Sequence, residues 1–176
     1  MNQPAAVIDI QEARERRRPS LVSKGSVHAV YRPAGATAHA AIFELLQEMY
    51  SEVGFFTMSE TKIKEQITDI IARGVSILAM CDDKLVGSIG LIPTTMWWSD
   101  EVVLSERWIF VSADYRRSTI AKDMFRLVND FATQASLTLV IGVFSPKQVV
   151  RKGNLFRRFF KPVGEIFIGG KTNVLR

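Results

Sequence analysis

A turn between a buried strand and an amphipathic helix constrains this chain more than any other feature. Residues 108–111 are bulky and apolar, as in a buried strand, and the turn after them carries Arg116, Arg117, Ser118 and Thr119. Apolar residues then recur at helical spacing: Ile120, Met124, Leu127, Val128, Phe131 and Ala135. The first amides of a helix lack internal partners, and the helix dipole is positive at that end. Because two guanidinium groups add donors suited to phosphate, the turn predicts an anion site.

This turn resembles the pyrophosphate-binding loop of the GCN5-related N-acetyltransferases. The family's pattern is Gln or Arg, two variable residues, Gly, one variable residue, and then Gly or Ala. Residues 116–121 match it at Arg116 and Ala121, but Thr119 replaces the first glycine. Glycine there permits close backbone approach to phosphate, so Thr119 either crowds the coenzyme or adds a hydroxyl donor. The resemblance implies that the coenzyme binds Arg116, Arg117, Ser118, Thr119, Ile120, Ala121 and Lys122.

The order of expected elements supports the same resemblance. The sequence predicts a strand at 27–33, two helices ending at 53 and 74, a hairpin over 75–92, and a strand within 102–111. A helix from 120 to 135, a buried strand over 137–144, a basic helix from 146 to about 160 and a strand at 165–168 follow. This is the acetyltransferase order, which implies an α/β (α+β) fold with a mixed, mostly antiparallel central sheet flanked by helices. The second helix has a capping-box pattern from Thr57 to Glu60.

Length and composition indicate one globular domain. The chain has 176 residues, of which 47% are hydrophobic and 23% charged. We expect a basic, flexible N-terminal tail over residues 1–25 and a single acetyltransferase-like domain over 26–176. No apolar run approaches the ~20 residues of a membrane helix, and the N-terminus does not resemble a signal peptide. With Cys81 as the only cysteine, an intrachain disulfide is excluded, and we expect a cytoplasmic protein without a membrane partner.

The formal net charge of +5 comes largely from one late segment. Residues 147–161 contain six basic side chains and no acidic one: Lys147, Arg151, Lys152, Arg157, Arg158 and Lys161. Two interpretations fit. The segment is a solvated helix face, or it binds a polyanion such as a nucleotide cofactor, a nucleic acid or an acidic protein.

The resemblance also implies a chemistry: transfer of an acyl group from acetyl-CoA, or another acyl-CoA, to an amine, without a metal. It assigns a backbone amide at Val111 to the thioester carbonyl. Phe110, Val111 and Phe144 would line a slot for the pantetheine arm, and Asn154 precedes the Leu-Tyr pair of the family's late helix. Here that pair is Leu155 and Phe156, and phenylalanine cannot donate a proton. Either the thiolate leaves without an acid, another group serves, or activity is lost.

Glu106 is the candidate general base. It lies five residues before Val111 on the same strand. Strand alternation would put Glu106, Trp108 and Phe110 on one face, where partial burial would raise the carboxyl pKa. The competing interpretation is an ion pair with a lysine or with Arg107 of a neighbouring chain.

Acceptor contacts are expected from two further places. Tyr50 lies at the end of the first helix, near where acceptors enter in the family. Trp97 and Trp98 connect two strands, and three interpretations fit them: a cover over the acceptor site, a homodimer interface, or the core. His28 and His39 lack ligand spacing, so no metal site is expected.

The residues therefore favour an acyl-CoA-dependent N-acyltransferase that transfers acetyl to a primary amine. Two alternatives stay open. One is a nucleic-acid-binding or nucleic-acid-modifying protein that uses the basic segment 147–161. The other is a catalytically degenerate, coenzyme-binding member of the same fold, because Thr119 and Phe156 depart from the family's pattern.

Overall fold

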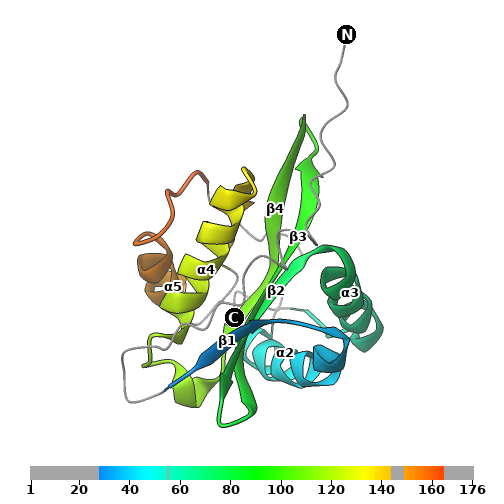
Figure 1. The fold of residues 1–176 in the computed structure, drawn as a ribbon, viewed down its shortest axis with the longest axis vertical. Coiled ribbons are helices and arrows are strands. Elements are labelled where there is room, and N and C mark those ends of the chain that lie inside the picture. The colour runs from blue at the N-terminus through cyan, green and yellow to red at the C-terminus, as the bar shows by residue number, and fades with distance from the viewer. Residues whose placement is uncertain (1–27, 55, 144–148, 165–176) are drawn as a thin grey trace.

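The computed structural model of the protein describes residues 28–54, 56–143 and 149–164 (Figure 1). One five-stranded sheet has the order β1-β2-β3-β4-β5. Its strands are β1 Val30–Pro33, β2 Val75–Cys81, β3 Lys84–Met96, β4 Ser99–Val111 and β5 Thr138–Val140. Neighbouring strands are antiparallel from β1 to β4, and only β5 runs parallel to β4. The mixed, mostly antiparallel sheet predicted from the sequence is therefore confirmed.

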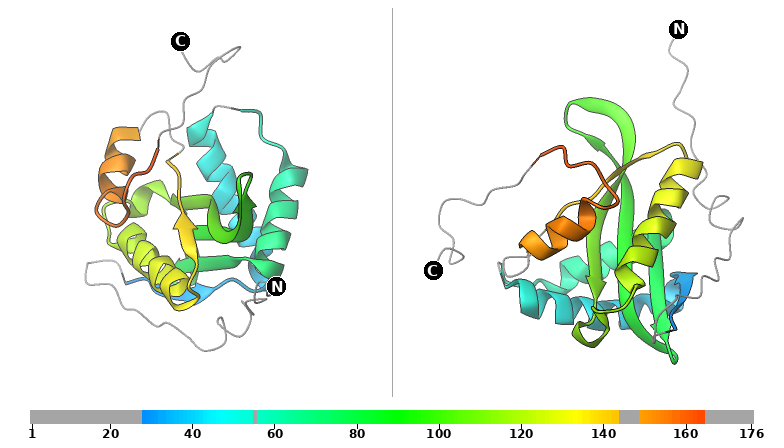
Figure 2. Two further views of the ribbon diagram at one scale, coloured as in Figure 1. Left: turned by 90° about the horizontal axis from the view of Figure 1, so that it is seen from above. Right: turned by 90° about the vertical axis from the view of Figure 1, so that its left-hand side faces the viewer.

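Helices cover both faces of this sheet (Figures 1 and 2). The α-helices are α2 His39–Val53, α3 Glu60–Arg73, α4 Ile120–Gln134 and α5 Val149–Phe156, and the short 3-10 helices are η1 Ala36–Ala38 and η2 Ala113–Tyr115. Helices α2 and α3 lie on one face, whereas α4 lies on the other with α5 beside it. The turn that the sequence singled out, residues 112–119, thus joins the end of β4 to α4.

Each face has its own hydrophobic core. Ile42, Ile67 and Ile70 from α2 and α3 are fully buried and pack with Trp108 of β4. On the other face, Ile120, Met124 and Val128 of α4 pack with Ile89, Leu91 and Leu104. Apolar residues three and four positions apart give each helix the stripe that seals its face of the sheet.

The start of α3 differs from the sequence prediction. Ser59, rather than Thr57, is the N-cap, and its Oγ accepts a hydrogen bond from the Lys62 amide at 3.5 Å. The capping-box prediction was wrong because Glu60 is already the first helical residue. A side chain three residues after the cap would have been needed to close the box.

Strand β5 is shorter and less buried than predicted. It pairs with β4 only from Val103 to Ser105, and its residues are exposed or half-buried. Beyond this point the Glu106 carboxylate, not a strand backbone, accepts the Gly142 amide at 3.2 Å. A side chain therefore replaces the ladder where the two strands separate. The expected strand at 165–168, Phe144 and the tail over 1–25 lie outside the described residues.

Candidate functional site

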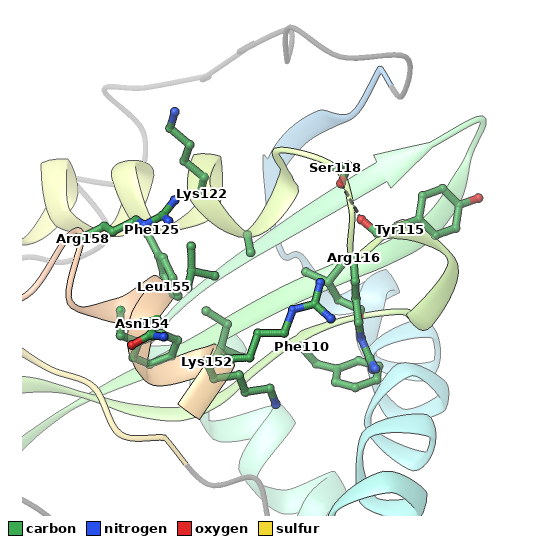
Figure 3. Close-up of a pocket in the computed structure, with 15 residues that line it drawn as sticks. Phe110, Tyr115, Arg116, Ser118, Lys122, Phe125, Lys152, Asn154, Leu155 and Arg158 are labelled. Atoms are coloured by element: carbon green, nitrogen blue, oxygen red, sulfur yellow. Dashed lines mark hydrogen bonds between the residues drawn. The ribbon is translucent and has the colours of Figure 1, made fainter. Parts of the chain in front are cut away.

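A cavity of about 370 Å³ lies where β4, the following turn, α4 and α5 meet (Figure 3). Its walls are formed by Ile109, Phe110, Val111, Tyr115, Arg116, Ser118, Ala121, Lys122, Phe125, Arg151, Lys152, Asn154, Leu155, Phe156 and Arg158. Five of these residues are basic and none of the fifteen is acidic. The cavity is therefore apolar at its base and cationic around it, a combination suited to a phosphorylated ligand with an apolar arm.

The sheet register turns the backbone of Val111 toward this cavity. Ser112 donates its amide to the Val86 carbonyl at 2.9 Å, so these two residues form a hydrogen-bonded pair with β3. In an antiparallel ladder the next pair, Val111 and Gly87, directs its N–H and C=O groups away from the partner strand. The Val111 carbonyl accepts from Arg116 Nε at 3.0 Å on that side. Its N–H points the same way, to the side from which β5 has departed.

Arg116 is held inside the protein. Besides the Val111 carbonyl, its guanidinium contacts Glu52 of α2 and lies over the Phe110 ring, 5.1 Å from the ring centroid. A planar guanidinium can satisfy a carboxylate, a carbonyl and an aromatic face together. Arg116 therefore fixes the turn against β4 and α2, and it forms an ion pair with Glu52.

A second acid on α2 holds the start of the same turn. Glu48 accepts from Ser112 Oγ at 2.7 Å and from the Ala113 amide at 3.1 Å. Glu48 and Glu52 are four residues apart and so lie on one face of α2. Sequence reasoning missed both residues. Their spacing was the available signal, but nothing in the sequence indicated which loop they would meet.

The first turn of α4 leaves two amides facing the cavity wall. Ser118 Oγ accepts from the Ile120 amide at 3.3 Å, and the first helical hydrogen bond runs from Asp123 to Thr119. The amides of Ala121 and Lys122 are therefore the remaining donors without an intrahelical acceptor. Both residues line the cavity, whereas Arg117 does not line it and Ile120 is fully buried in the core.

Thr119 faces the protein instead of the cavity. Its Oγ1 donates to Asp123 Oδ2 at 2.7 Å, and Asp123 Oδ2 also accepts from the Tyr31 hydroxyl at 3.0 Å. Burial, followed by the charge of Asp123, raises the Tyr31 pKa. The hydroxyl that replaces the loop's first glycine is thus engaged in an internal network at the start of α4.

Glu106 is half-buried at the point where β4 and β5 separate. Burial raises its pKa to about 7, against the opposing effects of the Gly142 amide, Lys152 and Arg107. The predicted alternation with Trp108 was wrong. A register shift opposite Gly90 and Leu91 pairs Trp108 with Gly90 but Glu106 with Leu91, which leaves Arg107 as an extra residue. Glu106 consequently shares the α4-side face with Leu91, while Trp108 packs on the α2 side.

Two residues from different helices interact electrostatically with this carboxylate. The Tyr50 pKa is raised by burial and then by the negative charge of Glu106. The Lys152 pKa is lowered by burial and by Arg116, while Glu52 and Glu106 act in the opposite direction. The fold thus brings the predicted base and a predicted acceptor contact together. It adds Lys152, which sequence reasoning recognised only as part of a basic segment.

Helix α5 and the turn that follows it supply the cavity's outer wall. Asn154 and Arg158 line the cavity, whereas the neighbouring Arg157 contacts Asn154 Oδ1 at 3.4 Å and does not line it. Phe156 packs edge-on against Phe125 of α4, with 4.7 Å between ring centroids. The basic segment therefore divides into residues that face the cavity and residues that do not.

Trp97 and Trp98 lie at the tip of the β3–β4 hairpin. Their exposed fractions are 91% and 65%, and the two rings meet edge to face at 5.1 Å. The interpretation that they belong to the core is wrong, because a two-residue turn carries them past the helices that cover the sheet. Neither lines the cavity. A cover for the acceptor and a homodimer interface stay predictions.

Two kinds of feature are missing from the residues that the structure describes. Within them, no group of three or more His, Cys, Asp or Glu side chains could hold a metal ion. No helix in that part of the chain has the length and apolar character needed to cross a membrane.

No protein-family model matches the sequence, and no curated protein matches it either. Solved structures do match. One is a possible acetyltransferase from Clostridium difficile 630, with 12% identity, a TM-score of 0.63, and coverage of 81% of this chain and 97% of the other. Another is AAC(6')-Iy in complex with a bisubstrate analogue of coenzyme A, with 16% identity, a TM-score of 0.65 and coverage of 82% and 98%.

A third match is the ribosomal-protein-alanine N-acetyltransferase from Brucella melitensis biovar Abortus 2308. Its identity is 16% and its TM-score 0.62, with coverage of 81% of this chain and 99% of the other. At such identities the likeness concerns the fold. The chain has the GCN5-related N-acetyltransferase fold, as the order of its elements predicted.

Proposed function

We propose that the protein is an acyl-CoA-dependent N-acyltransferase, with acetyl-CoA as the donor and a primary amine as the acceptor. One observation carries the proposal. The separation of β4 from β5 and the two amides at the start of α4 meet at one cationic cavity, and the half-buried Glu106 interacts electrostatically with Lys152 of the cavity wall. A structural role for the charged residues alone would not require this convergence.

Each part of an acyl-CoA has a counterpart in this arrangement. The amides of Ala121 and Lys122, with the Lys122 and Arg158 side chains, suit the phosphates. The apolar wall of Phe110 and Leu155 suits the pantetheine arm. The Val111 amide is directed to where a thioester carbonyl would develop negative charge in the transition state.

The reaction then needs a neutral amine and a base. Burial raises the pKa of Glu106 to about 7, so this carboxylate can accept the proton that the amine loses on attack near neutral pH. The charge of this carboxylate raises the pKa of Tyr50, which is the proposed acceptor contact. The structures similar to this one include an aminoglycoside N-acetyltransferase and a ribosomal-protein-alanine N-acetyltransferase, so both acceptor classes belong in a first screen.

The first experiment measures coenzyme binding by thermal shift and calorimetry. Acetyl-CoA at 100 times its dissociation constant should stabilise the protein by about 2.7 kcal/mol. Acceptors are then screened by thiol release, with aminoglycosides, peptides beginning with alanine, and simple diamines as separate arms. Absence of any stabilisation by acetyl-CoA or coenzyme A would refute the proposal. Binding without thiol release in every arm would instead favour the catalytically degenerate alternative.

Nucleic-acid binding remains the competing function because α5 is basic. It is tested by titrating labelled single- and double-stranded nucleic acid at several salt concentrations. Micromolar binding that acetyl-CoA does not displace would favour this alternative. Competition between the two would place both ligands at the same cationic cavity.

A further inference from the structure

Lys152 occupies an unusual position for a lysine. It is half-buried on α5, lines the cavity, and extends from α5 toward the strand that carries Phe110 (Figure 3). Most lysines of globular proteins keep their ammonium group in water. Burial lowers the Lys152 pKa, and the nearby Arg116 lowers it further.

Charged groups from three other elements face this ammonium. Glu52 on α2 and Glu106 on β4 favour the charged form of Lys152, whereas Arg116 after η2 opposes it. Tyr50 on α2 also lies near Glu106. Two carboxylates therefore favour the charged form of Lys152, while burial and Arg116 outweigh them and make its proton easier to release than that of an ordinary lysine.

The other lining groups are poorly suited to supply a proton near β4. The apolar side chains of Phe125, Leu155 and Phe156 have no proton to transfer, and arginine does not release its proton in proteins. Ser118 Oγ already donates to the Tyr115 carbonyl at 2.5 Å. In Figure 3 the Tyr115 hydroxyl and the Lys122 ammonium both point away from Phe110 and Lys152. Among the described lining residues, this leaves Lys152 facing the thioester end of the cavity.

We propose that Lys152 is the general acid of the reaction and protonates the departing thiolate of coenzyme A. This inference rests on the proposed acyl transfer. The amine nitrogen attacks the thioester carbonyl and forms the C–N bond, and its proton passes to Glu106. The C–S bond then breaks, the sulfur keeps the electron pair, and Lys152 gives it a proton. Return of the Glu106 proton to Lys152 restores both groups, so the cycle consumes no proton.

The test measures the thiol of bound coenzyme A, which needs no knowledge of the acceptor. Coenzyme A labelled with ¹³C next to sulfur is titrated by NMR while bound to the wild type and to Lys152→Gln, Lys152→Arg and Lys84→Gln. An ammonium beside the sulfur should increase the thiolate-to-thiol ratio at a given pH by about tenfold over Lys152→Gln. Lys152→Arg keeps the positive charge and should behave like the wild type, as should Lys84→Gln at the exposed first residue of β3.

Turnover separates proton donation from charge alone. With an acceptor from the screen, kcat should fall about 100-fold in both Lys152→Gln and Lys152→Arg, because neither side chain donates a proton. The coenzyme KM should change little, and the wild-type decline of kcat at alkaline pH should disappear in both variants. Equal thiol titration in the wild type and Lys152→Gln, or full turnover in Lys152→Arg, would overturn the inference and leave the proposed function standing. Failure of the wild type to bind coenzyme A would overturn both.

Discussion

Strands β2 and β4 belong to one sheet but differ in how their edges are used. Strand β2 pairs with β1 and β3, and six of its seven residues are buried. Strand β4 pairs with β3 throughout, yet with β5 only from Val103 to Ser105. Past that point, polar side chains and a cavity replace the missing strand.

The contrast shows where the fold leaves polar groups without a partner strand. A buried backbone group without a partner is costly, so a sheet normally continues or ends in solvent. Around Glu106 and Val111 the sheet does neither, and a half-buried carboxylate interacts electrostatically with a half-buried lysine, Lys152. The closed part of the sheet, where strands such as β2 are paired on both sides, supplies stability. The open part, where β4 continues past its pairing with β5, supplies polar groups for a ligand. Mutations should therefore separate the two properties.

Glu106→Gln is expected to have the largest effect. The amide keeps the size of the side chain and can still accept from Gly142, but it cannot take a proton. Turnover at saturating coenzyme should fall about 100-fold or more at pH 7, with little change in coenzyme affinity. Wild-type activity should rise as Glu106 ionises through about pH 7, and this rise should be missing in the variant.

The stability of the same variant provides its control. Burial raises the folded-state pKa of Glu106 from 4.5 to about 7, so protonation stabilises the fold. That contribution is fully present below about pH 4.5 and is lost as pH rises through 7. Glu106→Gln should therefore equal the wild type in melting temperature at pH 4 and exceed it at pH 8. A variant that melts earlier at pH 8 would show that Glu106 has a structural role.

Gly90→Ala probes the closed part of the sheet. A Cβ at Gly90 would lie 2.4 Å from the Trp108 ring, and the ring is fixed by its hydrogen bond to Ser88 at 3.1 Å. Overpacking of this kind should lower the free energy of unfolding by about 1–3 kcal/mol, measured in urea. Coenzyme affinity of the folded variant should be unchanged. A large loss of affinity without a loss of stability would contradict the division between the two regions.

Ala121→Glu probes the anion site at the start of α4. The added carboxylate would occupy the cavity wall beside the two amides proposed to bind phosphate, and coenzyme affinity should fall about tenfold or more by calorimetry. Ala121→Gln adds the same bulk without the charge and should reduce coenzyme affinity much less. Equal losses in both variants would show that only space is limiting and would argue against phosphate at this turn.

The sequence predicted the sheet and the cavity's two helices, because each follows from local pattern or from the spacing of a strand–turn–helix unit. It did not predict contacts made across the fold. Glu48 and Glu52 look like ordinary surface acids of an amphipathic helix until α2 is placed beside the β4–α4 turn. The register shift at Arg107 likewise depends on the partner strand, so alternation alone put Glu106 on the wrong face.

The smallest expected effect comes from the outer wall of the cavity. Arg158 lines the cavity, whereas its neighbour Arg157 contacts Asn154 and does not. Arg158→Gln should weaken coenzyme binding about three- to fivefold at low salt, and the loss should diminish as salt screens the interaction. Arg157→Gln removes the same charge one position away and should leave affinity unchanged. If the two variants behave alike, the net charge of residues 147–161 matters more than the direction of any side chain, and the solvated-face interpretation of the basic segment becomes the better one.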